Sequence, residues 1–130
     1  MNEEEFKART KGVALRVIRM TETLPNRRAA DVLARQLLRS ATSVGANYRA
    51  ACRSRSTAEL ISRLSIAEEE ADESIYWIEL LTDPGFIRVK KVAPLSGEIE
   101  EILRMIVASI KTLRHRPIRN PKSKNPKCVA

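Results

Sequence analysis

The stretch that decides the fold runs from Arg35 to Leu81 and contains two segments of unusual composition, Arg39-Ser-Ala-Thr-Ser-Val-Gly-Ala-Asn-Tyr-Arg-Ala-Ala51 and Glu68-Glu-Glu-Ala-Asp-Glu-Ser-Ile-Tyr-Trp77. Between them, residues 53–56 (Arg-Ser-Arg-Ser) have the composition of a tight turn. Apolar residues on both sides recur at steps of three and four, which is the period of an amphipathic α-helix. The stretch therefore predicts a hairpin of two antiparallel helices.

The two arms of this hairpin carry opposite charge. Residues 27–55 contain seven arginines and one acid, whereas residues 57–83 contain eight carboxylates and one arginine. A turn centred near residue 55 sets Arg39 opposite Asp72 and Arg35 opposite Tyr76. We therefore expect ion pairs between the arms, and exposed pairs of this kind contribute only about 0–1 kcal/mol each.

The two segments also resemble a known family. Residues 33–50 and 68–78 resemble the four-helix-bundle proteins encoded in intervening sequences of bacterial 23S rRNA genes, often labelled S23-type ribosomal proteins. More distantly, they are similar to the accessory variability proteins of diversity-generating retroelements. The resemblance covers roughly residues 6–114. It implies a homopentameric ring of four-helix subunits that is basic enough to bind nucleic acid and has no known catalysis.

The periodicity predicts four helices. They should cover about residues 4–23, 29–53, 57–82 and 94–114, with residues 86–92 forming a connection or an irregular helix start. Ser56-Thr-Ala-Glu59 is a capping box that should start the third helix, and Pro94 suits an early position of the fourth. Gly45, inside the second helix, suggests that a neighbouring helix approaches closely. The predicted fold class is an all-α, antiparallel up-down four-helix bundle of residues 1–114.

Each predicted helix has an apolar stripe that should face one core. With 43% hydrophobic and only 4% aromatic residues, that core must be mainly aliphatic, as in a helix bundle. In chain order, the stripes comprise Val13, Ala14, Val17, Ile18, Met20 and Leu24; Leu37, Ala41, Val44, Tyr48 and Ala51; Leu60, Leu64, Ala67, Ala71, Ile78 and Leu81; and Leu95, Ile99, Ile102, Ile106, Ile110 and Leu113.

Residues 115–130 differ in character from the rest. Pro117, Pro121 and Pro126 forbid a continuous helix, and the segment is rich in basic side chains, so we expect a flexible basic tail. The whole chain has a formal net charge of +8 and a pI near 10.0, which favours a polyanionic partner such as RNA or DNA. No apolar stretch approaches the ~20 residues that span a bilayer, and the acidic N-terminus is unlike a secretory signal. We therefore expect a cytoplasmic protein without a membrane partner.

The candidate nucleic-acid-binding residues are cations with few acids nearby. They are Arg27, Arg28, Arg53, Arg55, Lys111, Arg114, Arg116, Arg119, Lys122, Lys124 and Lys127. Contacts to phosphates would dominate such binding and carry little sequence information. The alternative, a solvated surface with a disordered end, stays open for each residue taken singly. In a ring, repetition of weak sites would raise the avidity.

A second set of polar and aromatic residues lies inside the hairpin. It comprises Arg35, Arg39, Asn47, Tyr48, Arg49, Glu68, Glu69, Asp72, Glu73, Tyr76 and Trp77. We predict a structural role, because buried polar atoms need partners: Asn47 and Tyr48 should tie the second helix to carboxylates of the third. Tyr76 and Trp77 should pack in the core or at a subunit interface. The alternative is polar recognition at a ring surface or subunit junction.

Two other functions remain as alternatives to nucleic-acid binding. Glu69-Glu70-Ala-Asp-Glu73 with Glu98-Ile-Glu-Glu101 resembles the magnesium site of helical nucleotide pyrophosphohydrolases, except that Glu101 replaces the final aspartate. Arginines opposite the first segment favour structural pairing instead. A single histidine excludes a di-iron bundle, and Ser and Cys lack a base. We therefore predict a non-catalytic protein without metal or cofactor, or else a scaffold for a protein partner such as a reverse transcriptase.

Overall fold

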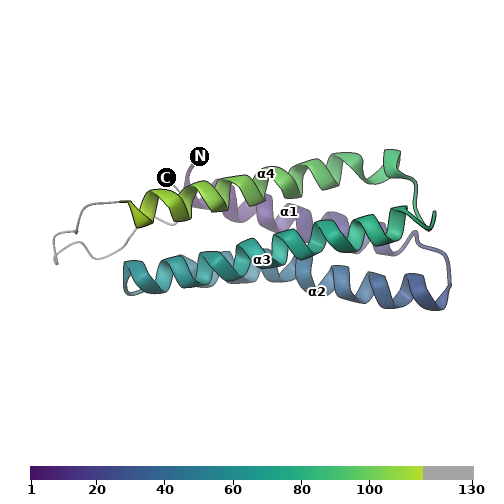
Figure 1. Ribbon diagram of the computed structural model, residues 1–130, viewed down its shortest axis with the longest axis horizontal. Helices are drawn as coiled ribbons and strands as arrows, with labels where there is room; N and C mark the ends of the chain where they lie inside the picture. Colours follow the sequence, from purple (N-terminus) through teal and green to yellow (C-terminus); the bar gives the residue numbers. More distant parts are fainter. Residues whose placement is uncertain (116–130) are drawn as a thin grey trace.

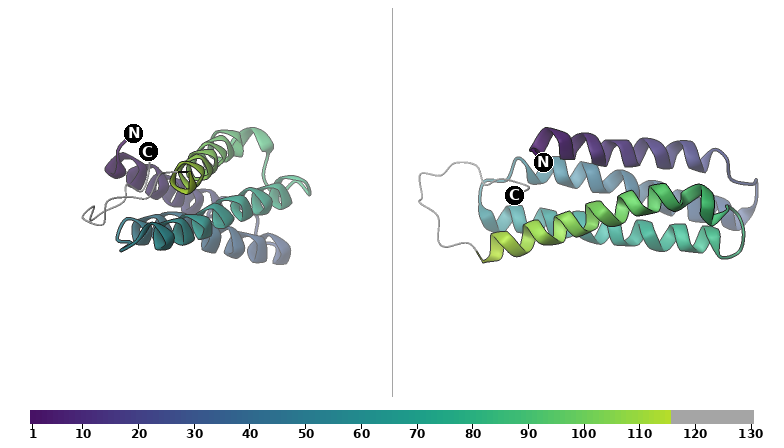
Figure 2. Two further views of the ribbon diagram at one scale, coloured as in Figure 1. Left: turned by 60° about the vertical axis from the view of Figure 1, so that its left-hand side comes forward. Right: turned by 90° about the horizontal axis from the view of Figure 1, so that it is seen from above.

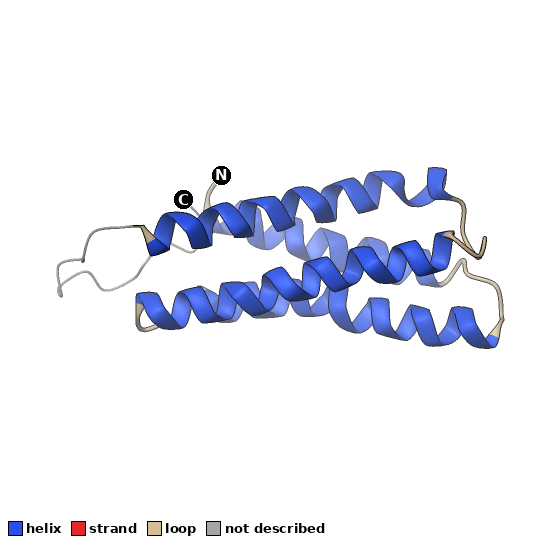
Figure 3. Ribbon diagram, viewed as in Figure 1, coloured by secondary structure: helices blue, strands red, loops and turns tan. Residues whose placement is uncertain are grey.

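The computed structural model describes residues 1–115, which form four α-helices and no strand (Figures 1 and 3). The helices are α1 (Glu3–Thr21), α2 (Arg28–Ala51), α3 (Thr57–Thr82) and α4 (Val89–Arg114). Short loops join them, so consecutive helices run antiparallel, and the predicted all-α four-helix bundle is confirmed. Within residues 1–115, no helix is long and apolar enough to cross a membrane.

Side-chain caps start α1 and α3. Asn2 Oδ1 accepts a hydrogen bond from the Glu5 amide (2.8 Å), and Ser56 Oγ accepts one from the Glu59 amide (3.1 Å). The predicted capping box is displaced by one residue, because Glu59 accepts from the amide of Arg55 (3.3 Å) rather than from that of Ser56. This hydrogen bond, together with one from Arg63, lowers the pKa of Glu59.

Of the two alternatives predicted for residues 86–92, the structure has a helix start, and α4 begins at Val89. Pro94 is therefore the sixth residue of the helix and lies beyond its first turn. Proline there forgoes a hydrogen bond to the carbonyl oxygen four residues earlier. Burial of Val92 in the core, in the turn before Pro94, offsets that cost. Tertiary packing thus extends the helix beyond the boundary that the proline rule predicts.

The core confirms most of the predicted apolar stripes. Every stripe residue of α2, α3 and α4 is buried. On α1 the prediction is partly wrong: Val13 and Val17 are buried, but Ile18 is 42% exposed, whereas Phe6 and Thr10 are buried outside the predicted stripe. Ile18 follows Val17 by about 100° around the helix, which turns it away from the core. The remaining α1 stripe residues are half-buried: Ala14, Met20 and Leu24.

The helices pack unequally around the core. Contact is most extensive between α2 and α3 and least between α1 and α4. In the right-hand view of Figure 2, α1 and α4 lie close together where α4 begins and diverge where it ends. Against α2, in contrast, α1 packs tightly, because a Cβ added to Gly45 would lie 3.1 Å from Thr10 Oγ1. The predicted packing reason for Gly45 is therefore confirmed.

Candidate nucleic-acid interface

The predicted nucleic-acid-binding cations fall at opposite ends of the bundle (Figure 1). The turn end, where α2 meets α3, carries Arg53 and Arg55, together with Lys111 and Arg114 of the last turn of α4. The opposite end, which we call the two-loop end, is formed by loops 22–27 and 83–88. It carries Arg27 and Arg28, at the start of α2. The 24 residues of α2 separate the ends by about 36 Å. One compact site cannot contain both sets.

All six predicted cations within residues 1–115 are exposed: Arg27, Arg28, Arg53, Arg55, Lys111 and Arg114. None forms an ion pair within this range. Their positive charge is therefore available to an external partner. The other predicted cations lie outside the described residues: Arg116, Arg119, Lys122, Lys124 and Lys127.

Sequence reasoning missed part of the two-loop end. Arg27 lies over the ring of Phe86, with the guanidinium carbon 6.0 Å from the ring centroid, so the two loops meet there. Arg88, Lys90 and Lys91 at the start of α4 belong to the same end, and all three are exposed. The sequence signal for this basic cluster is three cations within the four residues 88–91. These cations fall in a segment, residues 86–92, that the sequence predicts to be a connection or an irregular helix start.

Pairing between the oppositely charged arms is confirmed only for Arg39. Its guanidinium lies 3.3 Å from Glu70 and 3.2 Å from Glu73 on α3, and these contacts raise its pKa, that to Glu70 contributing most. The other two arginines of the hairpin, Arg35 and Arg49, form no ion pair with α3 within residues 1–115, contrary to the predicted pairing between the arms. Arg35 pairs with Asp31 of its own helix (3.0 Å). Arg49 lies in a groove between α1 and α2.

The predicted link from Asn47 to carboxylates of α3 is also wrong, whereas that from Tyr48 stays a prediction. Asn47 Nδ2 donates to the backbone oxygen (2.9 Å) and hydroxyl (2.8 Å) of Ser43, one turn earlier in α2. The buried Tyr48 ring packs on Phe6 of α1, with centroids 4.6 Å apart. The amide of Asn47 is therefore satisfied within α2, and the ring of Tyr48 packs against α1.

The buried polar contact between α2 and α3 is a pair of serines instead. Ser40 Oγ and Ser74 Oγ are 2.9 Å apart, and both residues are fully buried. Each hydroxyl also reaches a backbone carbonyl oxygen of its own helix, Ser40 that of Leu37 (3.3 Å) and Ser74 that of Glu70 (2.8 Å), so either serine can donate to the other. The small side chains of this segment thus let the two helices approach closely.

Only part of the acidic segment of α3 is held in ion pairs. Glu68, Glu69 and Asp72 form no ion pair within residues 1–115, contrary to the prediction. Trp77 packs against the core as predicted, but Tyr76 is 52% exposed and makes a ring contact with Trp77 (centroids 5.2 Å apart). Packing of Tyr76 in the subunit core is therefore wrong, and its place at a subunit interface stays a prediction.

The two halves of the magnesium-like carboxylate pattern face different neighbours. Glu70 and Glu73 turn to Arg39 on α2, whereas Glu98 and Glu101 turn to Arg9 on α1. Within residues 1–115, no group of three or more acidic, His or Cys side chains is placed to hold a metal ion. Four carboxylates of the pattern are therefore held in ion pairs between helices.

A charged clamp joins α1 to the middle of α4, and sequence reasoning missed it. Arg9 donates to both carboxylate oxygens of Glu98, from Nη2 (2.6 Å) and Nε (2.9 Å), and its Nη2 lies 3.2 Å from Glu101. These hydrogen bonds lower the pKa of Glu98 and raise that of Arg9, with a smaller effect on Glu98 from the charge of Arg16. We call these three residues, Arg9, Glu98 and Glu101, the Arg9 clamp.

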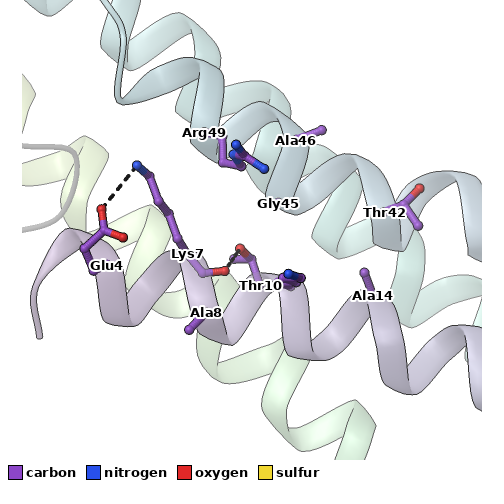
Figure 4. Close-up of a pocket in the computed structure, with 10 residues that line it drawn as sticks. Glu4, Lys7, Ala8, Thr10, Ala14, Thr42, Gly45, Ala46 and Arg49 are labelled. Atoms are coloured by element: carbon purple, nitrogen blue, oxygen red, sulfur yellow. Dashed lines mark hydrogen bonds and ion pairs between the residues drawn. The ribbon is translucent and has the colours of Figure 1, made fainter.

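A groove of about 550 Å³ runs between α1 and α2 (Figure 4). Its walls include the small residues Ala8, Ala14, Gly45 and Ala46. Arg49 projects into it from α2 and Lys7 from α1, but Lys7 is drawn toward Glu3 (3.7 Å) and Glu4 (3.5 Å). Part of the groove's positive charge is therefore neutralised within α1.

Comparisons with known proteins identify the family. The pattern described as 23S rRNA-intervening sequence protein matches residues 3–108. The chain belongs to this family. A crystal structure of a protein of unknown function from the S23 ribosomal protein family, from Bacteroides thetaiotaomicron, superposes on it with a TM-score of 0.78. The two are 33% identical, over 85% of this chain and 99% of the other. No curated protein matches the chain. The 23S rRNA-intervening sequence resemblance is thus confirmed, and neither match indicates a catalytic family.

Proposed function

We propose that this 23S rRNA-intervening sequence protein is a non-catalytic RNA-binding protein that contacts the phosphate backbone. The observation that carries the proposal is the set of exposed cations at both ends of the bundle, which form no ion pair within residues 1–115. A net charge of +8 adds a long-range attraction for polyanions. Contacts of this kind position a nucleic acid without selecting its sequence.

The distribution of acids supports the same proposal. Carboxylates are concentrated on α3, where Glu70 and Glu73 hold Arg39 and others face solvent. The cations at the two ends come mostly from α2, α4 and their flanking loops. The acidic run of α3, residues 68–73, thus lies between the two ends that carry the unpaired cations. RNA is the first candidate because the family description refers to 23S rRNA.

We propose further that the subunits assemble into a homopentameric ring, as the family resemblance implies. Exposed aliphatic side chains on the described helices support subunit contacts; they include Leu15, Ile18, Val32, Ile66 and Val107. A ring would present each end's cations five times, and this repetition would strengthen RNA binding without any new contact. Light scattering on the eluting peak of a sizing column should give the mass of five 14.7 kDa chains, and a monomer mass would refute the assembly.

The test of RNA binding compares the full chain with a chain that ends at Arg114. Fluorescence anisotropy with a labelled single-stranded RNA, at low salt, should show binding by both proteins, because the described residues already carry the unpaired cations. The full chain should bind more tightly, since residues 115–130 are rich in basic side chains and contain no acid. Absence of binding by the full chain would refute the proposal.

A further inference from the structure

A cleft of about 330 Å³ opens between α1 and α4 at the two-loop end of the bundle. It lies beyond the Arg9 clamp, where the two helices are close together (Figure 2). Three of its lining residues are basic and three are apolar: Arg16, Arg19 and Lys91, with Met20, Ile87 and Leu95. Its volume is about ten times the ~30 Å³ that a water molecule occupies. A hydrated phosphate group therefore fits.

Nothing in the described chain neutralises these three cations. Arg16, Arg19 and Lys91 form no ion pair within residues 1–115, and no acid lines the cleft. The charge of Arg16 acts weakly on Glu98, whose carboxylate accepts two hydrogen bonds from Arg9. Arg9 thus neutralises part of the negative charge on the α4 side of the cleft.

The walls of the cleft strengthen its field. Ile87 and Leu95 are buried, so low-dielectric material lies directly behind the charged groups. A cleft with charges of one sign and apolar walls focuses the electrostatic potential and concentrates counter-ions. The positive end of the α4 dipole lies at the same end of the bundle, where the first turn contains no acid.

We propose that the α1–α4 cleft, with Arg16 and Arg19 on one wall and Lys91 on the other, binds phosphate groups of the RNA backbone. This inference rests on the proposed function and assigns it to a site on two helices rather than to scattered surface cations. The site differs from the cations predicted from sequence, because it forms only when the ends of α1 and α4 come together.

The test replaces the three cations by glutamine, R16Q/R19Q/K91Q, in the full chain. The matched control, K11Q/R35Q/R104Q, removes the same charge from exposed positions outside the cleft. Binding of a labelled single-stranded RNA is measured against salt for both triple variants and for the wild type. Because Arg16 is half-buried, circular dichroism checks folding, and the exposed pair R19Q/K91Q provides a second, milder variant.

The cleft triple should weaken binding by about tenfold or more and reduce the log–log salt slope by about 2, since each phosphate contact on single strands contributes ~0.7. The control should weaken binding less than about threefold, through long-range attraction alone. If both triples lower affinity equally while the wild type binds, the cleft assignment is wrong and the proposed function stands. If the wild type itself fails to bind, both proposals are wrong.

Discussion

Replacing Arg9 by methionine should destabilise the bundle by about 2 kcal/mol. The substitution removes two charge-assisted hydrogen bonds to Glu98 and the contact with Glu101 but keeps an unbranched apolar stem. The two principal side chains are only 22% and 23% exposed, so water screens this pair less than a surface pair. Charge-assisted hydrogen bonds contribute about 1.5–3 kcal/mol when desolvated, and exposed surface pairs contribute about 0–1. Because Arg9 and Glu98 are partly buried, we expect a loss in the lower part of the first range.

The matched control is Arg35→Met, which removes an arginine from an exposed pair. Arg35 and Asp31 are 76% and 60% exposed, so this loss should not exceed about 0.5 kcal/mol. Urea unfolding followed by circular dichroism gives both free energies. The melting temperature should fall by roughly 6–10 °C for Arg9→Met. Equal effects of the two substitutions would refute the clamp as a stabilising element.

Three further predictions concern the same interfaces. Folding lowers the pKa of Glu98, so the ionised Glu98 side chain stabilises the protein above the unfolded pKa of ~4.3, and this stabilisation is lost as the pH falls through the folded pKa. Urea unfolding at descending pH should therefore show a steeper loss of stability in the wild type than in Glu98→Gln. Ser40→Ala and Ser74→Ala should each cost about 1 kcal/mol, whereas the double variant should cost less than their sum, as a double-mutant cycle would reveal. Gly97→Ala, in open space, should stabilise α4 by up to about 1 kcal/mol, while Gly45→Ala should be less favourable because its Cβ would lie 3.1 Å from a buried threonine; equal thermal shifts would contradict the close helix contact.

Sequence periodicity predicted the parts of the fold that depend on one helix at a time. The stripes of α2, α3 and α4 are buried as expected, and the predicted glycine contact is present at Gly45. The ends of helices were less predictable, because burial of Val92 carries α4 through a region that Pro94 should have kept irregular. Local sequence preferences fail to predict a helix end where tertiary packing offsets the cost of an unfavourable residue.

Contacts between helices were predicted less well than the helices themselves. Antiparallel register alone placed Arg39 correctly against α3, but it could not show that Arg49 and Tyr48 face α1. The reason is geometric. The register of a helical hairpin fixes which residues lie at the same height along the two helices. The rotation of each helix about its own axis, which depends on the packing of the whole core, determines which neighbouring helix a residue faces. The Arg9 clamp joins residues 89 positions apart and left no local signal.

The same limit applies to the candidate binding surface. Composition showed that the chain is basic, and the exposed cations near Arg27 and Arg53 could be found by looking for few neighbouring acids. Their separation to opposite ends, and the cleft between α1 and α4, follow only from the helix order and packing. Charge is therefore predictable from sequence, whereas the geometry that makes a site is not.

The most direct test of the central claim is the dependence of RNA affinity on salt for the full chain. If phosphate contacts carry the binding, log affinity should fall linearly with log salt, with a slope of about −0.7 for each contact on a single strand. Contacts from the cations of one end and of the α1–α4 cleft predict a slope steeper than about −3. A flat dependence, or no binding at low salt, would contradict the account and leave the +8 charge without a role in RNA recognition.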